Sequence, residues 1–116
     1  MRRFLTAVGF AVEGIVHGVR TQRHLRFHCC AALLALLLGV YCQLSALQWG
    51  LLTLTIAAVI AAELFNTAIE SVVDLVSPEW QPLAKAAKDT AAGAVLVIAG
   101  AALIIGALLF APAFFN

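Results

Sequence analysis

Four polar side chains interrupt an apolar stretch of the chain, and their types suit chemistry at a membrane surface. They are Glu63, Asn66, Glu70 and Asp74. Intervals of three, four and four residues place all of them on one face of an α-helix, with Thr67 just beside them. A carboxylate inside a membrane span costs about 3 kcal/mol or more and usually marks function. A shallow carboxylate suits contact with a lipid headgroup, and an adjacent one suits a divalent cation.

Cationic side chains occur both before and after this segment in the sequence. Lys85, Lys88 and Asp89 fall together on one helical face. Lys88 beside Asp89 suits either the neutralisation of a phosphate or an ion pair with a neighbouring helix. Three arginines near the N-terminus suit either a phosphate site or simple anchoring to anionic headgroups. They are Arg20, Arg23 and Arg26.

Carboxylates and cations of this kind suit phosphoryl transfer to a lipid hydroxyl, which needs a base, ligands for Mg²⁺ and charges for the phosphates. The sequence contains no Walker A pattern and no protein-kinase signature, so spacing alone does not indicate nucleotide binding. A small proton-coupled transporter is the second hypothesis, although its carboxylate is expected near the middle of the membrane. A structural subunit or an inactive relative of an enzyme is the third. The carboxylates cluster at one membrane interface rather than at mid-membrane, which favours the lipid-modifying enzyme over the transporter.

The composition indicates that a membrane surrounds the elements that carry these residues. Of 116 residues, 64% are hydrophobic and 11% are charged, and the mean hydropathy is +1.04. Soluble domains average about 25% charged residues. A net charge of +1 also excludes a basic nucleic-acid-binding protein, so we expect no nucleic-acid partner.

Charged residues occur only in the windows 1–28 and 63–89, and the apolar stretches around them predict three membrane spans. The predicted spans are 29–46, 50–73 and 91–113. We therefore expect an all-α membrane protein whose single domain covers residues 1–116. A short turn around Gln43–Gln48 joins the first two spans. Ser77 followed by Pro78 predicts the N-cap of the helix that carries the third span.

The positions of Lys and Arg predict the orientation, because all of them precede the first span or lie between the second and third. The positive-inside rule then places the N-terminus in the cytoplasm and the C-terminus outside. Counted about 20 residues inward from Trp49, the hydrocarbon core ends near residue 69. Glu63 would lie about 9 Å inside this boundary at 1.5 Å per residue. Glu70 would lie at the boundary and Asp74 just beyond it.

Residues 3–20 have the periodicity of an amphipathic helix lying in the membrane interface. Its apolar residues fall within about 100° of the helical wheel. They are Phe4, Val8, Ala11, Val12, Ile15 and Val19. Phe10 lies on the polar face instead, which suits either a stray exposed aromatic or a stacking surface for a flat ligand. The segment 1–28 is therefore predicted as a surface helix and its connection to the first span.

The run ELFNTAIESVVDLVSPEWQPLAKAAKD, residues 63–89, resembles the small prokaryotic diacylglycerol kinase family. Its core, E-[LI]-x-N-[ST]-A-I-E-x-V-V-D, is highly specific to that family, and the resemblance continues into AVGFAVEGIVHGVRTQRHLRFH, residues 7–28. It covers nearly the whole chain. The stretch QPLAK, residues 81–85, looks most like the Gram-positive branch, whose members phosphorylate undecaprenol rather than, or in addition to, diacylglycerol.

The resemblance implies an ATP- and Mg²⁺-dependent lipid kinase of the bacterial cell membrane. It also implies a homotrimer with active sites between protomers, each with three spans and an interfacial helix. The lipid substrate would be undecaprenol, with diacylglycerol as the alternative.

The resemblance also implies roles for individual residues. Glu63 matches the general base for the lipid hydroxyl, Glu70 matches the carboxylate that binds the metal, and Asn66 matches a supporting residue. Asp74 and Arg26 are further expected to support the site. The positions expected around the nucleotide include both metal ligands and several others. They are Arg3, Phe10, Gln22, Glu70, Glu79, Trp80, Gln81, Lys88 and Asp89.

Gln22 departs from the family pattern, which usually has a glutamate as the second metal ligand at this position. A glutamine offers Mg²⁺ one neutral oxygen and removes a charge. We therefore expect weaker metal binding, or a further oxygen ligand from water or a phosphate. The substitution also keeps open the hypothesis of an inactive kinase relative.

Overall fold

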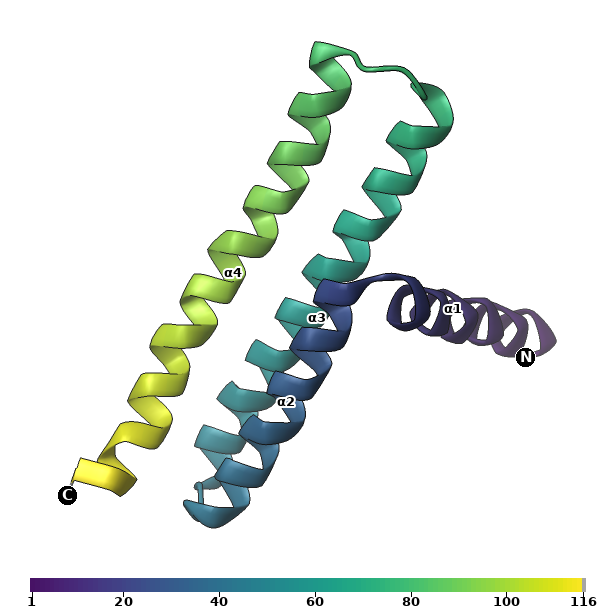
Figure 1. The fold of residues 1–116 in the computed structure, drawn as a ribbon. Helices are drawn as coiled ribbons and strands as arrows, with labels where there is room; N and C mark the ends of the chain where they lie inside the picture. Colours follow the sequence, from purple (N-terminus) through teal and green to yellow (C-terminus); the bar gives the residue numbers. More distant parts are fainter. Residues whose placement is uncertain (116) are drawn as a thin grey trace.

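The computed structural model describes residues 1–115 and contains, over that range, only helices and their connections (Figure 1). The helices are α1 (Arg2–Thr21), α2 (Arg23–Tyr41), α3 (Ala46–Val76) and α4 (Pro82–Phe115). This architecture confirms the predicted all-α fold. Three of the helices, α2, α3 and α4, are long and apolar enough to cross a membrane. The prediction of three spanning helices is therefore also confirmed.

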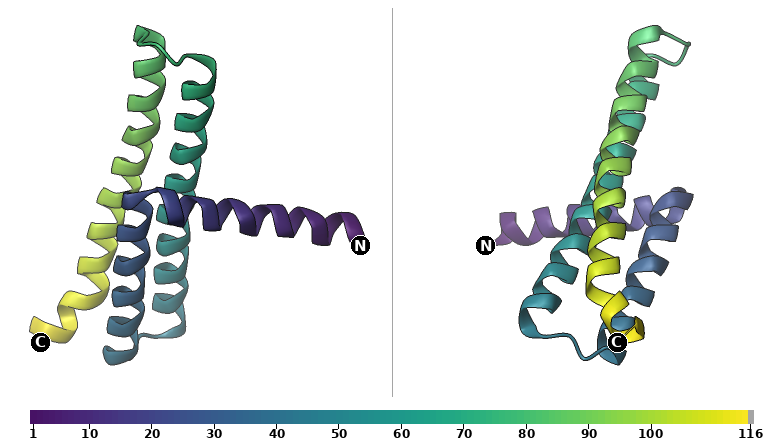
Figure 2. Two further views of the ribbon diagram at one scale, coloured as in Figure 1. Left: turned by 45° about the vertical axis from the view of Figure 1, so that its right-hand side comes forward. Right: turned by 90° about the vertical axis from the view of Figure 1, so that its left-hand side faces the viewer.

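The three long helices form a bundle from which α1 projects sideways. Figures 1 and 2 show α3 and α4 side by side along most of their length, with α2 against the half of α3 that begins the helix. At 1.5 Å per residue, the 31 residues of α3 span about 46 Å, against a hydrocarbon core of about 30 Å. One end of α3 therefore extends well beyond the membrane core.

The connection between α2 and α3 is placed differently from the sequence prediction. The first predicted span, 29–46, runs past the end of α2, because Tyr41 is the last helical residue and Gln43 has a φ of 54°. A capping box then starts α3 four residues before the predicted span. The Ser45 hydroxyl accepts a hydrogen bond from the Gln48 amide at 3.3 Å, and the Gln48 side chain accepts one from the Ser45 amide at 2.9 Å.

The connection between α3 and α4 corrects the predicted N-cap at Ser77. Ser77 instead follows the last residue of α3, and its hydroxyl donates to the main-chain oxygen of Glu79 at 3.0 Å. α4 begins at Pro82, nine residues before the predicted span 91–113. A proline disfavours helical backbone in the residue before it and suits the first turn of a helix. Pro78 thus ends α3, and Pro82 rather than Pro78 opens α4.

The joint between α1 and α2 is a single extended residue, Gln22, with φ −111° and ψ 113°. Arg26 reaches back across this joint, and its Nη1 donates to the main-chain oxygens of Val19 at 3.1 Å and Arg20 at 2.9 Å. These carbonyls belong to the last turn of α1 and have no partner within the helix. The guanidinium of Arg26 therefore caps α1 and fixes the angle between the two helices.

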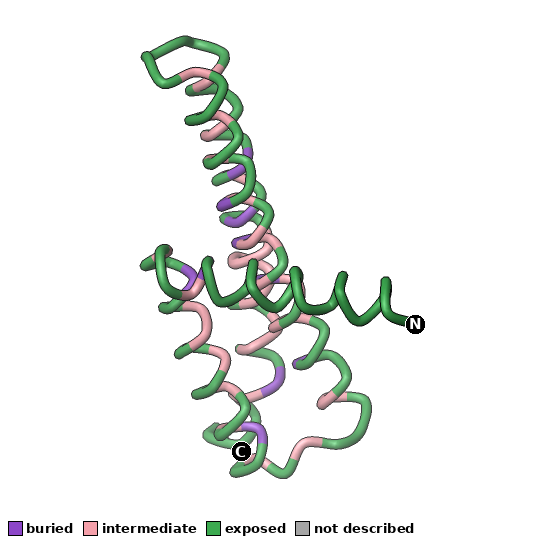
Figure 3. The backbone as a smooth tube through the Cα atoms, turned by 90° about the vertical axis from the view of Figure 1, so that its right-hand side faces the viewer, coloured by how far each residue is buried: buried purple, intermediate pink, exposed green. Residues whose placement is uncertain are grey.

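Very little of the chain is buried against itself (Figure 3). The buried hydrophobic residues are Leu25, Leu52, Val59, Ala91, Val95 and Leu109. Two polar residues, Glu63 and Thr67, are buried with them. Most of the apolar surface of the described residues therefore faces outward.

Candidate active site

The polar face predicted from spacing lies on one uninterrupted helix, α3, and its exposure rises toward the end of that helix. Glu63 is 4% exposed, Asn66 and Glu70 are half-buried, and Asp74 is exposed. Burial falls along the helix, because the most buried carboxylate is also the one farthest from the end of α3. The face thus carries carboxylates from the covered part of the bundle to the exposed end of α3.

Glu63 contacts a residue whose importance the sequence analysis missed. The Nε2 atom of His28, on α2, lies 3.3 Å from Glu63 Oε1, and both side chains are largely covered. The Thr67 hydroxyl donates to the main-chain oxygen of Glu63 at 2.9 Å, not to its carboxylate. The sequence did hold a signal for His28, because an ionisable residue at the start of a predicted span is a functional candidate.

One turn along α3, Asn66 and Glu70 form a second pair. Asn66 Nδ2 donates to Glu70 Oε1 at 3.4 Å. Asn66 Oδ1 is buried without a hydrogen-bond partner, which is unusual for a buried polar atom. A carboxylate and a free amide oxygen on neighbouring turns are ligand types that suit Mg²⁺.

The exposed end of α3 is linked to α4 by charge. Lys88 Nζ, on α4, lies 2.5 Å from Asp74 Oδ1, on α3. A second ion pair lies within α4, where Lys85 Nζ is 2.5 Å from Asp89 Oδ2. Of the two interpretations left open for Lys88, the pair across helices is the one found within a single chain. Because both partners remain partly exposed, Lys88 can still meet a phosphate group arriving from water.

The other residues expected near the nucleotide are not all brought together within one chain. Glu79, Trp80 and Gln81 form the exposed loop between α3 and α4. Arg3 and Phe10 lie on α1, which points away from that loop, and Phe10 is 66% exposed (Figures 1 and 2).

The two expected metal ligands, Gln22 and Glu70, are not joined by a hydrogen bond within residues 1–115. Gln22 donates instead to Thr21 Oγ1 at 3.4 Å, and no cluster of three His, Cys, Asp or Glu residues occurs over the same range. The ligand types thus fit Mg²⁺, whereas one chain brings together only part of a site.

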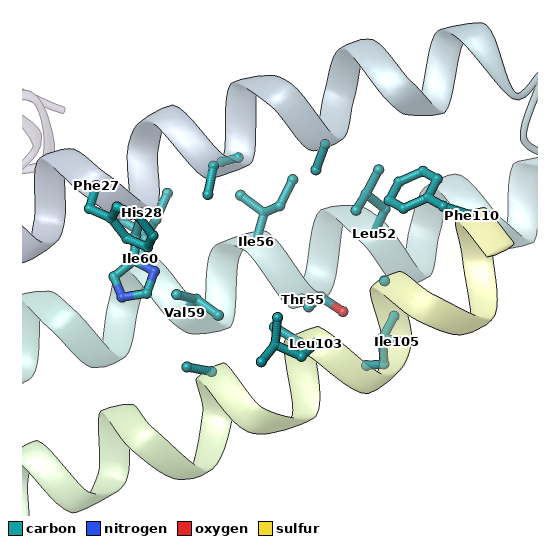
Figure 4. Close-up of a pocket in the computed structure, with 16 residues that line it drawn as sticks. Phe27, His28, Leu52, Thr55, Ile56, Val59, Ile60, Leu103, Ile105 and Phe110 are labelled. Carbon is teal, nitrogen blue, oxygen red and sulfur yellow. The ribbon is translucent and has the colours of Figure 1, made fainter.

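An apolar cleft of about 450 Å³ lies between α2, α3 and α4 (Figure 4). Small residues such as Ala99, Ala102 and Gly106 open it on the α4 side, and Leu52 and Phe110 line one end. His28 lines the other end, together with Val59 and Ile60, one turn before Glu63. The cleft therefore leads along the apolar interior toward the buried carboxylate.

The sequence matches the prokaryotic diacylglycerol kinase family over residues 9–110. The chain belongs to this family. It is 45% identical to an undecaprenol kinase of Bacillus subtilis over 97% of this chain and 91% of that protein. It is 41% identical to a diacylglycerol kinase of Synechocystis over 93% of this chain and 62% of that protein. A diacylglycerol kinase of Escherichia coli is 30% identical over 82% of this chain and 78% of that protein.

Family membership confirms the predicted resemblance and the predicted lipid kinase. It also supports ATP as the co-substrate and, together with the three apolar helices, a bacterial membrane protein. The choice between a lipid kinase and a transporter is thereby decided in favour of the kinase.

Proposed function

We propose that this kinase transfers the γ-phosphate of ATP to the hydroxyl of undecaprenol, with diacylglycerol as the weaker substrate. The 45% identity to an undecaprenol kinase supports this preference, because it extends over nearly the whole of both chains. The observation that carries the reaction type is the buried carboxylate of Glu63. It lies one turn beyond the end of an apolar cleft and on the same helical face as exposed charged side chains.

Glu63 acts as the general base. Its carboxylate accepts the proton of the lipid hydroxyl while the hydroxyl oxygen attacks the γ-phosphorus, and the bond between that phosphorus and the β,γ-bridging oxygen breaks to release ADP. A lipid alcohol held in the membrane presents its hydroxyl at the depth of Glu63. The exposed end of α3 is where ATP arrives from water.

Glu70 and Gln22 would hold Mg²⁺, and Asn66 supports Glu70 through its hydrogen bond. Bound Mg²⁺ neutralises charge on the phosphates. Lys88 neutralises charge on the nucleotide phosphates, and Asp74 positions it through their ion pair. Asp89 lies next to Lys88 and also belongs to the nucleotide site. The loop residues Glu79, Trp80 and Gln81, with Arg3 and Phe10, complete the nucleotide site. Arg26 supports the site indirectly by capping α1.

The active unit is a homotrimer with sites between protomers. Two features support this assembly. α1 projects sideways from the bundle (Figure 2), and in a trimer it would bring its Arg3 and Phe10 to a neighbouring copy. The small buried core also leaves wide apolar faces that neighbouring copies can cover. We further infer that α1 is amphipathic and lies in the interface, that the N-terminus is cytoplasmic and that the C-terminus is outside.

A kinase assay in mixed micelles with ATP and Mg²⁺ tests the proposal, with undecaprenol and diacylglycerol offered separately. We expect phosphorylation of both and a preference for undecaprenol. Glu63→Gln should lower kcat by about 10²- to 10⁴-fold, because it removes the proton acceptor. Glu13→Gln, an exposed change on α1, is the matched control and should leave kcat unchanged. A preference for diacylglycerol would overturn the substrate assignment, and an inactive but folded trimer would favour the non-enzymatic relative.

A further inference from the structure

The carboxylate of Glu63 has a single polar partner among residues 1–115, and that partner is His28. Glu63 is 4% exposed and lies within a helix that crosses the membrane, where an unpaired charge is costly. The contact joins Nε2 of the imidazole to Oε1 of the carboxylate at 3.3 Å. An ionised carboxylate oxygen only accepts, so a hydrogen bond across this contact would be donated by Nε2. The contact lies at Oε1, and Oε2 has no polar partner among residues 1–115.

The position of His28 relates this hydrogen bond to the lipid. His28 lines the end of the apolar cleft near Glu63, whereas Glu63 itself lies one turn beyond the lining residues Val59 and Ile60. Figure 4 shows the imidazole extending from α2 into the space between the helices, next to Val59. The ring of Phe27 packs edge-on against it, with centroids 5.5 Å apart. The imidazole is thus held where the cleft meets the carboxylate.

We propose that His28 is a positioning residue for lipid phosphorylation: its Nε2–H fixes Oε1 of Glu63, so that Oε2 is directed at the hydroxyl of a lipid alcohol whose chain lies in the cleft. The inference rests on the proposed function, in which Glu63 accepts the hydroxyl proton. Without the hydrogen bond the carboxylate adopts other rotamers in a cavity that offers it no alternative partner. A misplacement of about 1 Å at a reacting group costs about 100-fold in rate.

Three variants test the inference in the mixed-micelle assay. His28→Leu removes the donor, and we expect kcat to fall by about 10- to 100-fold with the KM for ATP unchanged. His28→Gln keeps an N–H donor at a similar reach, and we expect it to restore kcat to within about threefold of the unchanged protein. His24→Leu, an exposed histidine on the same helix, is the matched control and should have no effect.

The outcomes separate this inference from the proposed function. If the unchanged protein phosphorylates no lipid, the proposed function fails first. If it is active and His28→Leu keeps full kcat, the positioning role alone is overturned. If His28→Gln is as impaired as His28→Leu, the imidazole itself takes the proton, and a positioning role is again overturned.

A structural measurement covers the case in which His28→Leu does not fold. The ¹⁵N chemical shifts of the His28 imidazole should indicate a protonated, hydrogen-bonded Nε2 in the unchanged protein. Glu63→Gln should shift the Nε2 signal, whereas Glu70→Gln should leave it in place. Identical His28 spectra in all three proteins would refute the hydrogen bond.

Discussion

The contact that holds α1 against the bundle depends on a glycine. A Cβ atom at Gly18 would lie 2.9 Å from Leu25 Cδ2 and 3.0 Å from Leu64 Cδ2, closer than such atoms normally approach. Leu25 is 0% exposed, so its side chain has no free space to enter. We therefore expect Gly18→Ala to push α1 away from α2 and α3.

The size of the effect can be worked out against a control in the same helix. Overpacking of this kind costs about 1–3 kcal/mol, and alanine stabilises a helix by about 1 kcal/mol relative to glycine. A Cβ at Gly9 would meet nothing within 4 Å, so Gly9→Ala gains the helix propensity alone. Both variants gain the same helix propensity, so this contribution cancels when their free energies are compared. Their difference of about 1–3 kcal/mol corresponds to about 5- to 150-fold in the population with α1 detached.

Trypsin cleavage at the joint between α1 and α2 measures this population, because Arg20 and Arg23 flank Gln22 and cleavage requires the joint to open. The protein would be digested in lipid–detergent micelles, and the cleavage rates of the two variants compared. We expect Gly18→Ala to be cleaved about 5- to 150-fold faster than Gly9→Ala. Equal rates would refute the reasoning, because they would mean that α1 does not dock through Gly18.

Three further predictions follow from other contacts. A Cβ at Gly39 would lie 2.7 Å from the Trp49 ring, so Gly39→Ala should destabilise the protein by about 1–3 kcal/mol in detergent unfolding, whereas Gly50→Ala, with nothing within 4 Å, should not. Gln22→Glu adds a charged metal ligand and should lower the Mg²⁺ concentration for half-maximal activity by about tenfold; an unchanged Mg²⁺ dependence would exclude Gln22 as a ligand. Lys88→Met removes a cation for the phosphates and should raise the KM for ATP by about tenfold while the KM for lipid stays constant.

The polar face of α3 could be predicted because it depends only on local geometry. A helix period of 3.6 residues brings Glu63, Asn66, Glu70 and Asp74 into line whatever surrounds them. The predicted depth of each residue likewise used only the position of Trp49 and the rise per residue. Both quantities are properties of one helix, so no knowledge of its neighbours was needed.

The partners of these residues could not be predicted in the same way. The pairs His28–Glu63 and Lys88–Asp74 join different helices. Each pair forms only if the two helices pack in one particular axial register. The sequence left the role of Lys88 open for that reason. The start of α4 was misplaced because Pro78 and Pro82 both satisfy the local signal for a first helical turn.

The cap that Arg26 places on α1 has a mechanical consequence. One extended residue separates α1 from α2, and two hydrogen bonds from Arg26 bind the end of α1 to the first turns of α2. Because this joint is rigid, α1 turns together with α2. A spanning helix tilts when the thickness of the bilayer changes, and a tilt of α2 swings the far end of α1 in proportion to its 20 residues, about 30 Å. A change in bilayer thickness therefore moves Arg3, near the far end of α1, farther than Phe10, near the middle of the helix.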